Sequence, residues 1–149
     1  MSERSGRRLD MSVIAAGGLA SGALALVTAL LLQASVSTEG VGPTAATLSD
    51  AFSVFFGAAI GLAAGSASVA FAARTGPRIL SGLIASLLGY VLILAPTLIA
   101  TAPSDVSVPE SISTAALAAA LVTPAILLGA TVGAGIRGYR TTDPYRRLR

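Results

Sequence analysis

The sequence predicts an all-α membrane protein with four transmembrane helices in an up-down-up-down bundle and with both termini on the cytoplasmic side. Of its 149 residues, 54% are hydrophobic and only 11% are charged, whereas soluble domains carry about a quarter charged residues. Four apolar runs each have roughly the twenty residues that cross the hydrocarbon core of a bilayer. All ten basic residues are arginines, and they lie only before the first run, between the second and third, and after the fourth.

This distribution of arginines predicts the topology. Cytoplasmic flanks of membrane spans retain Lys and Arg, and short translocated loops are depleted in them, which is the positive-inside rule. The two remaining connectors contain no basic residue. We therefore expect a cytoplasmic anchor made of Arg4, Arg7, Arg8, Arg74, Arg78, Arg137, Arg140, Arg146, Arg147 and Arg149.

The first predicted span covers residues 11–33 and follows a short cytoplasmic tail, residues 1–10. Basic residues ahead of an apolar run are also typical of a signal peptide, but an apolar signal region has only about 7–15 residues. The pair Arg7-Arg8 is similar to a twin-arginine signal, yet Asp10 interrupts the apolar residues expected after it. We therefore expect an uncleaved first helix.

The second predicted span covers residues 51–73 and follows a connector, residues 34–50, that is rich in Ser, Thr, Gly and Pro. This connector ends in Thr47-Leu48-Ser49-Asp50, which has the spacing of a capping box. We expect Thr47 to cap the second helix, which would then begin a few residues before its apolar span.

The third and fourth spans, predicted at residues 79–100 and 112–136, complete the bundle. A tight turn over residues 74–78 contains Gly76-Pro77 and makes the second and third helices antiparallel neighbours. A second capping box, Ser107-Val108-Pro109-Glu110, precedes the fourth span, and Pro109 suits a first helical turn. A tail follows over residues 137–149, so residues 1–149 form a single integral membrane domain with no stretch long enough for a separate soluble core.

Glycines spaced four residues apart are the most prominent motif within the spans. Such a glycine zipper lets helix backbones approach closely, and this contact holds helices together where lipid supplies little hydrophobic force. The predicted helix-packing residues are Gly57, Gly61 and Gly65 in the second span, Gly18 and Gly22 in the first, and Gly129 and Gly133 in the fourth. They suit either packing within the bundle or a self-association face.

Two prolines lie inside predicted spans. Pro96 and Pro124 each remove a backbone hydrogen bond and favour a kink. We take both as hinge candidates, since broken helices in transporters expose backbone carbonyls to a substrate. Isolated prolines are also common in transmembrane helices with no such role.

The spans lack the side chains that most membrane chemistry requires. No Asp, Glu, Lys, Arg or His lies between the ends of any span, whereas proton-coupled transport normally uses an intramembrane ionisable group. The chain has no His to act as a general base and no Cys to bind metal. We predict no catalytic residue, no cofactor and no metal site, and no nucleic-acid partner, because topology already explains the arginines.

Two classes of function remain open. The first is a non-enzymatic accessory or structural component of the cell membrane that acts through helix packing in the lipid bilayer, alone or with a larger membrane protein as its partner. The alternative is a homo-oligomeric channel or small transporter built on the glycine-zipper interface.

Overall fold

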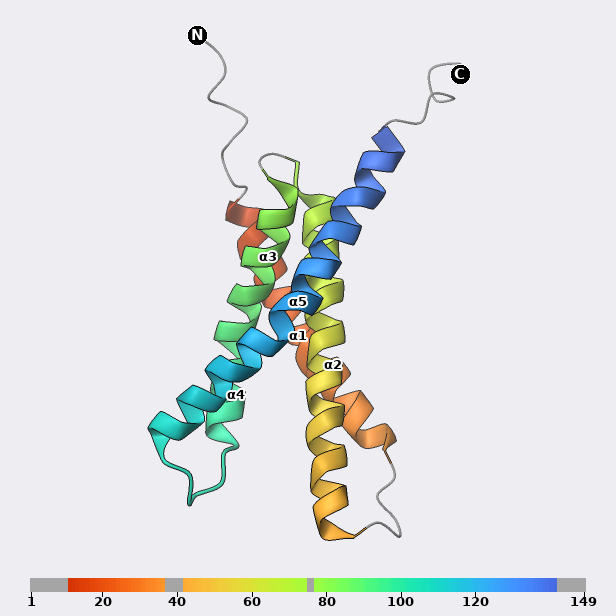
Figure 1. Cartoon of the computed structure of the whole chain (residues 1–149). Coiled ribbons are helices and arrows are strands. Elements are labelled where there is room, and N and C mark those ends of the chain that lie inside the picture. The colour runs from red at the N-terminus through yellow and green to blue at the C-terminus, as the bar shows by residue number, and fades with distance from the viewer. Residues whose placement is uncertain (1–10, 37–41, 75–76, 142–149) are drawn as a thin grey trace.

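The computed structural model describes residues 11–36, 42–74 and 77–141 of the chain, and within them it contains helices and no strand (Figure 1). Four helical segments are long and apolar enough to cross a bilayer. They are α1 (Met11–Ser35), α2 (Pro43–Ala72), a composite third segment and α5 (Val108–Thr141). The third segment consists of α3 (Arg78–Gly89), the π-helical turn η2 (Tyr90–Leu94) and α4 (Ala95–Ala100). The predicted fold class of four antiparallel spans is confirmed.

Among the residues that the structure describes, the two ends of the bundle differ in charge. The beginning of α1, the end of α2, the beginning of α3 and the end of α5 lie together at one end (Figure 1). We call it the arginine end, because Arg74, Arg78 and Arg137 belong to these helix ends. The opposite end is the acidic end, where α2 and α5 begin and the connector between α4 and α5 lies. That the arginine end faces the cytoplasm remains a prediction.

The start of α2 corrects one prediction. The helix begins at Pro43, four residues before Thr47, and its N-cap is Gly42, which makes no side-chain capping bond. Pro43 is well suited to this place, because its fixed φ is helical and the missing N–H would have no partner in a first turn. Thr47 lies inside the helix, and its Oγ1 donates to the carbonyl of Pro43 at 3.0 Å. The predicted capping box at Thr47 is therefore wrong.

One of the two bonds of the second predicted capping box is present at the start of α5. The helix begins at Val108, directly after Ser107, with Pro109 in its first turn. The Glu110 carboxylate accepts from the Ser107 N–H at 2.9 Å and from the Ser107 hydroxyl at 2.7 Å. One backbone donor at the start of the helix is thereby satisfied, and a negative charge lies near the positive end of the helix dipole.

The third segment changes its winding just before Pro96. The N–H of Ala95 bonds to the carbonyl of Tyr90, five residues back, within the π-helical turn η2. Proline cannot donate a backbone bond, and its ring crowds the carbonyl four residues earlier, so a wider turn ahead of it relieves the conflict. Pro124, by contrast, lies within α5, which stays helical from Val108 to Thr141.

The core of the bundle is built largely from small residues. One cluster of buried side chains joins α1, α2, η2 and α5, and it contains Ala25, Ala29, Ala58, Ala59, Leu62, Tyr90, Leu94, Val122 and Ile126. Many larger apolar side chains instead face outward, among them Phe52, Phe56 and Ile60 of α2, each more than half exposed. Small residues inside and bulky apolar residues outside are expected for helices surrounded by lipid tails, because lipid is as favourable an environment for a bulky apolar side chain as the bundle interior.

Candidate functional site

The glycines of α2 lie against α1 of the same chain. A Cβ built on Gly57 would lie 2.5 Å from Ala29 Cα and 2.7 Å from Thr28 O. A Cβ on Gly61 would collide with Ala25, and one on Gly65 with Ser21. Since real Cβ atoms do not approach so closely, only glycine at these three positions permits this spacing between α1 and α2.

The other predicted helix-packing glycines also lie in contacts between helices of this chain. Gly18 and Gly22 of α1 face α3, where a Cβ on Gly22 would lie 2.6 Å from the carbonyl oxygen of Gly89. Gly129 and Gly133 of α5 face α2, and a Cβ on either would collide with the backbone, at Ala63 or Ala67. Every predicted glycine face is therefore occupied within the bundle.

Hydroxyl groups also bridge pairs of helices within the bundle. Ser66 of α2 donates to the carbonyl of Ile126 in α5 at 2.7 Å, and Ser86 of α3 donates to the carbonyl of Leu62 in α2 at 3.0 Å. Thr28 of α1 donates to the carbonyl of Gly57 at 2.6 Å. Such bonds satisfy polar groups inside the bundle and tie adjacent helices together.

The sequence contained a signal for these bridging hydroxyls. Ser86 lies four residues after Gly82, and Ser66 lies four residues before Ala70, so each serine shares a helix face with another small residue. Serine at such a position can approach a neighbouring backbone as closely as alanine and can also donate to it. Which carbonyl accepts depends on how the helices are rotated, and that is not visible in the sequence.

Arg137 joins the end of α5 to the end of α2. Its Nη1 donates to the carbonyls of Phe71 and Ala73, the latter at 3.1 Å. The last carbonyls of a helix lack intrahelical partners and carry the negative end of its dipole, so a guanidinium group there is stabilising. Of the other predicted anchor residues, Arg74 is exposed and Arg78 is half-buried at the same end.

The remaining arginines of the predicted anchor belong to the two tails. Arg4, Arg7, Arg8, Arg146, Arg147 and Arg149 lie outside the described residues, as does the side chain of Arg140.

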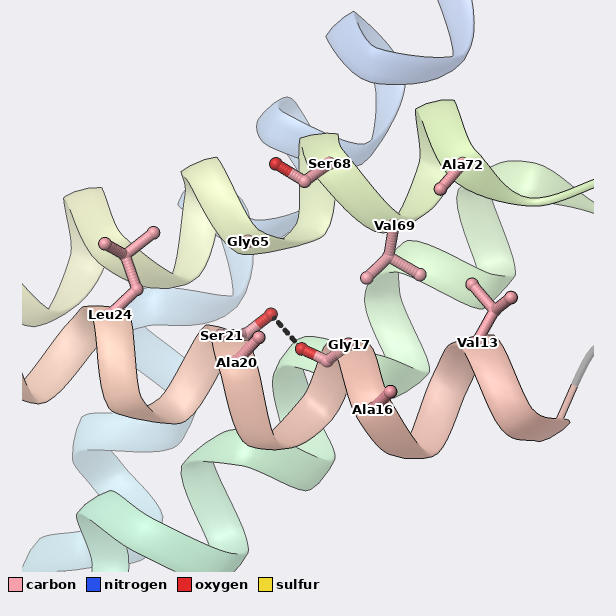
Figure 2. A pocket seen from close by; sticks show the side chains of 10 residues that line it. All are labelled: Val13, Ala16, Gly17, Ala20, Ser21, Leu24, Gly65, Ser68, Val69 and Ala72. Atoms are coloured by element: carbon pink, nitrogen blue, oxygen red, sulfur yellow. Dashed lines mark hydrogen bonds between the residues drawn. The ribbon is translucent and has the colours of Figure 1, made fainter.

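A shallow groove runs along the outside of α1 and α2 toward the arginine end, and we call it the α1/α2 groove (Figure 2). Its volume is about 430 Å³, and its lining consists of Val13, Ala16, Gly17, Ala20, Ser21, Leu24, Gly65, Ser68, Val69 and Ala72. Figure 2 shows Ser21 donating to the carbonyl of Gly17, at 2.7 Å, and Ser68 likewise donates to its own helix, to Ala64 at 2.9 Å. The groove is therefore lined mainly by small residues, together with Val13, Leu24 and Val69, and both of its serine hydroxyls already donate within their own helices.

A second groove lies toward the acidic end and is lined by α2, the third segment and α5. The beginning of α2 stands apart from α4 at that end of the bundle (Figure 1). The volume of this groove is about 500 Å³, and we call it the acidic-end groove. It is lined by Thr47, Asp50, Ala51, Val54, Phe55 and Ala58 of α2, by Tyr90, Leu94 and Leu98 of the third segment, by Thr101, and by Thr114, Ala118 and Val122 of α5.

Among residues 11–36, 42–74 and 77–141, no three acidic side chains lie close enough together to hold a metal ion, so Asp50, Asp105 and Glu110 do not form a metal site. Ser66 is fully buried and its hydroxyl is engaged with α5, so it is not presented as a nucleophile. The hydroxyl of Thr123, beside Pro124, donates to the carbonyl of Ala119 at 2.8 Å.

The fold and these contacts define a small multi-pass α-helical membrane protein. No family model, no curated protein and no solved structure matches the chain.

Proposed function

We propose that this chain is a non-enzymatic accessory or structural component of the cell membrane, which packs against a larger membrane protein. The supporting observation is the α1/α2 groove, a small-residue surface that lies on the outside of the bundle. Ala16, Ala20 and Ala72 are exposed along it. In a bilayer, close van der Waals contact along such surfaces drives helix association.

The distribution of polar groups supports the non-enzymatic part of the proposal. The hydroxyls of Ser21, Ser66 and Ser86 all donate to other groups in the bundle. The chain contains no His and no Cys that could activate a nucleophile or bind a metal. Its means of action are therefore association and packing.

The alternative, an oligomeric channel or small transporter assembled through the glycine zipper, has less support. Gly57, Gly61 and Gly65 already lie against α1, so this face could meet a second copy only if α1 moved away. Such an oligomer would need a different interface.

The test is native mass spectrometry of the chain released gently from its own membrane. We expect a hetero-complex of fixed composition that is lost in Ala20→Leu, because a larger side chain in the α1/α2 groove occupies the space for a partner helix. Ala120→Leu is the matched control, since Ala120 is exposed on α5 outside either groove. A monomer or a homo-oligomer in the wild type, or a complex that Ala20→Leu leaves intact, would contradict the proposal.

A further inference from the structure

The acidic-end groove has the size and wall chemistry of a small-molecule site. Its volume of about 500 Å³ falls in the range of ligand pockets, roughly 300–1,000 Å³. Its walls are mainly apolar, with Phe55, Leu94 and Val122 contributed by three different segments. Pockets of this kind bind an apolar body and orient it through a few polar groups.

The hydroxyl groups that line the groove can still accept hydrogen bonds, but each already uses its hydrogen in a bond within the protein. Three threonine hydroxyls donate to carbonyls of the preceding helical turn: Thr47 to Pro43 at 3.0 Å, Thr101 to Thr97 at 2.8 Å and Thr114 to Glu110 at 2.9 Å. The Tyr90 hydroxyl donates to the carbonyl of Ala115 at 2.6 Å. Each hydroxyl oxygen retains only lone pairs for a ligand.

Asp50 adds a negative charge to this lining. The residue is half-buried, and its carboxylate has no hydrogen-bond or ion-pair partner among the residues that the structure describes. The described arginine side chains, those of Arg74, Arg78 and Arg137, belong to the opposite end of the bundle. The groove therefore combines apolar walls, a carboxylate and hydroxyl oxygens that only accept.

We propose that the acidic-end groove binds a hydrophobic amine in its ammonium form. The apolar body would lie against Val54, Phe55 and Leu98, and the ammonium group would donate to Asp50 and to threonine oxygens near it. An ammonium has three donors and a positive charge, which is the complement of an acceptor-only lining. A carboxylate or phosphate would meet the charge of Asp50 with no donor to compensate, so an anionic amphiphile is disfavoured.

The proposal is tested by photo-crosslinking the purified full chain in phosphatidylcholine nanodiscs. The probe is dodecylamine with a diazirine in its chain, and the corresponding dodecanol and dodecanoate probes carry the same reactive group. We expect the amine to label the walls of the groove about tenfold more than the alcohol does, because hydrogen bonds to a charged group are the stronger ones. Dodecanoate should label the walls least. Peptide mapping by mass spectrometry locates the labels.

Matched variants identify the carboxylate responsible. Asp50→Asn should reduce amine labelling to the level of the alcohol, and Asp50→Glu should retain it. Asp105→Asn is the control, because Asp105 belongs to the adjoining connector but does not line the groove. Ala118→Phe should reduce labelling by all three probes, since a phenyl ring would fill the space between α2 and α5.

The proposal is overturned if the amine labels wild type and Asp50→Asn equally, or if its labels lie only on the lipid-facing sides of the helices. Comparing each variant with wild type for one probe removes differences in how the probes partition into lipid. Asp50→Glu preserves the charge and controls for misfolding, so loss of labelling in both Asp50 variants would also count against the proposal.

Discussion

Replacing Gly61 with alanine should separate α1 from α2 and destabilise the bundle. The new Cβ would lie 2.6 Å from the backbone nitrogen of Ala25 and 2.6 Å from Thr28 Oγ1. Non-bonded heavy atoms prefer about 3.5–4.0 Å, so the two helices must move apart by about 1 Å. Backbone atoms cannot rotate out of the way as the end of a flexible side chain can.

The energetic cost has two parts. Overpacking in a well-packed interior costs about 1–3 kcal/mol. The hydrogen bond from Thr28 to the carbonyl of Gly57, now 2.6 Å, would lengthen beyond bonding distance, and interhelical bonds in membranes contribute about 0.6–1.7 kcal/mol. We therefore expect the free energy of unfolding to fall by about 2–5 kcal/mol in Gly61→Ala.

Steric trapping in bicelles measures this free energy without removing the bilayer environment. The control is Gly135→Ala in α5, because a Cβ at Gly135 would have no atom within 4 Å apart from the backbone of its own helix. That variant should be neutral, or stabilised by up to about 1 kcal/mol through helix propensity. If Gly61→Ala proves as stable as Gly135→Ala, then α1 and α2 do not pack through this glycine and the interface described here is wrong.

Three further predictions concern other contacts. Ser66→Ala should lower the free energy of unfolding by about 1 kcal/mol, because the variant loses the buried hydrogen bond to the carbonyl of Ile126. The control Ser68→Ala removes an exposed hydroxyl that bonds within its own helix, so it should leave the free energy of unfolding unchanged. Equal effects of the two substitutions would contradict the interhelical role of Ser66. Arg137→Leu should expose the end of α2 to faster amide hydrogen exchange around Phe71 and Ala73, whereas unchanged protection would show that the guanidinium contact contributes nothing. In this cysteine-free chain, Ser104→Cys should react with an impermeant thiol reagent on intact cells and Tyr139→Cys only after permeabilisation; the reverse pattern would invert the predicted orientation.

Local sequence patterns were sufficient to predict the positions of the four spans and their order through the bundle. Span positions depend on apolar runs of about twenty residues, and these can be read along the chain without knowing any neighbour. The same is true of the box at Ser107 and Glu110, whose partners lie three residues apart. The predicted start of α2 was wrong because two local signals compete there, the capping-box spacing at Thr47 and the helical φ of Pro43. The helix begins at Pro43, so Thr47 lies inside it.

The candidate sites were only partly visible in the sequence. The spacing of Gly57, Gly61 and Gly65 indicates a packing face. It does not indicate whether that face packs against another helix of the same chain or against a second copy. Pro96 indicated a distortion, whereas the π-helical turn ahead of it is known only from the structure. Asp50 belongs to the capping box that the sequence predicts at Thr47, whereas in the structure the residue lines a groove formed with two other segments.

The sequence by itself determined the class of protein, the number of spans, their antiparallel succession and the restriction of arginines to the two tails and the second connector, because each depends on hydropathy or charge summed over a local stretch. Only the tertiary structure decided which helix covers each glycine face, which carbonyls Ser66 and Ser86 reach, and where the two grooves open. The reason is that these helices are apolar on every side and both lipid and the bundle interior accept such surfaces, so the rotation of each helix follows from the close fit of small residues against neighbouring backbones.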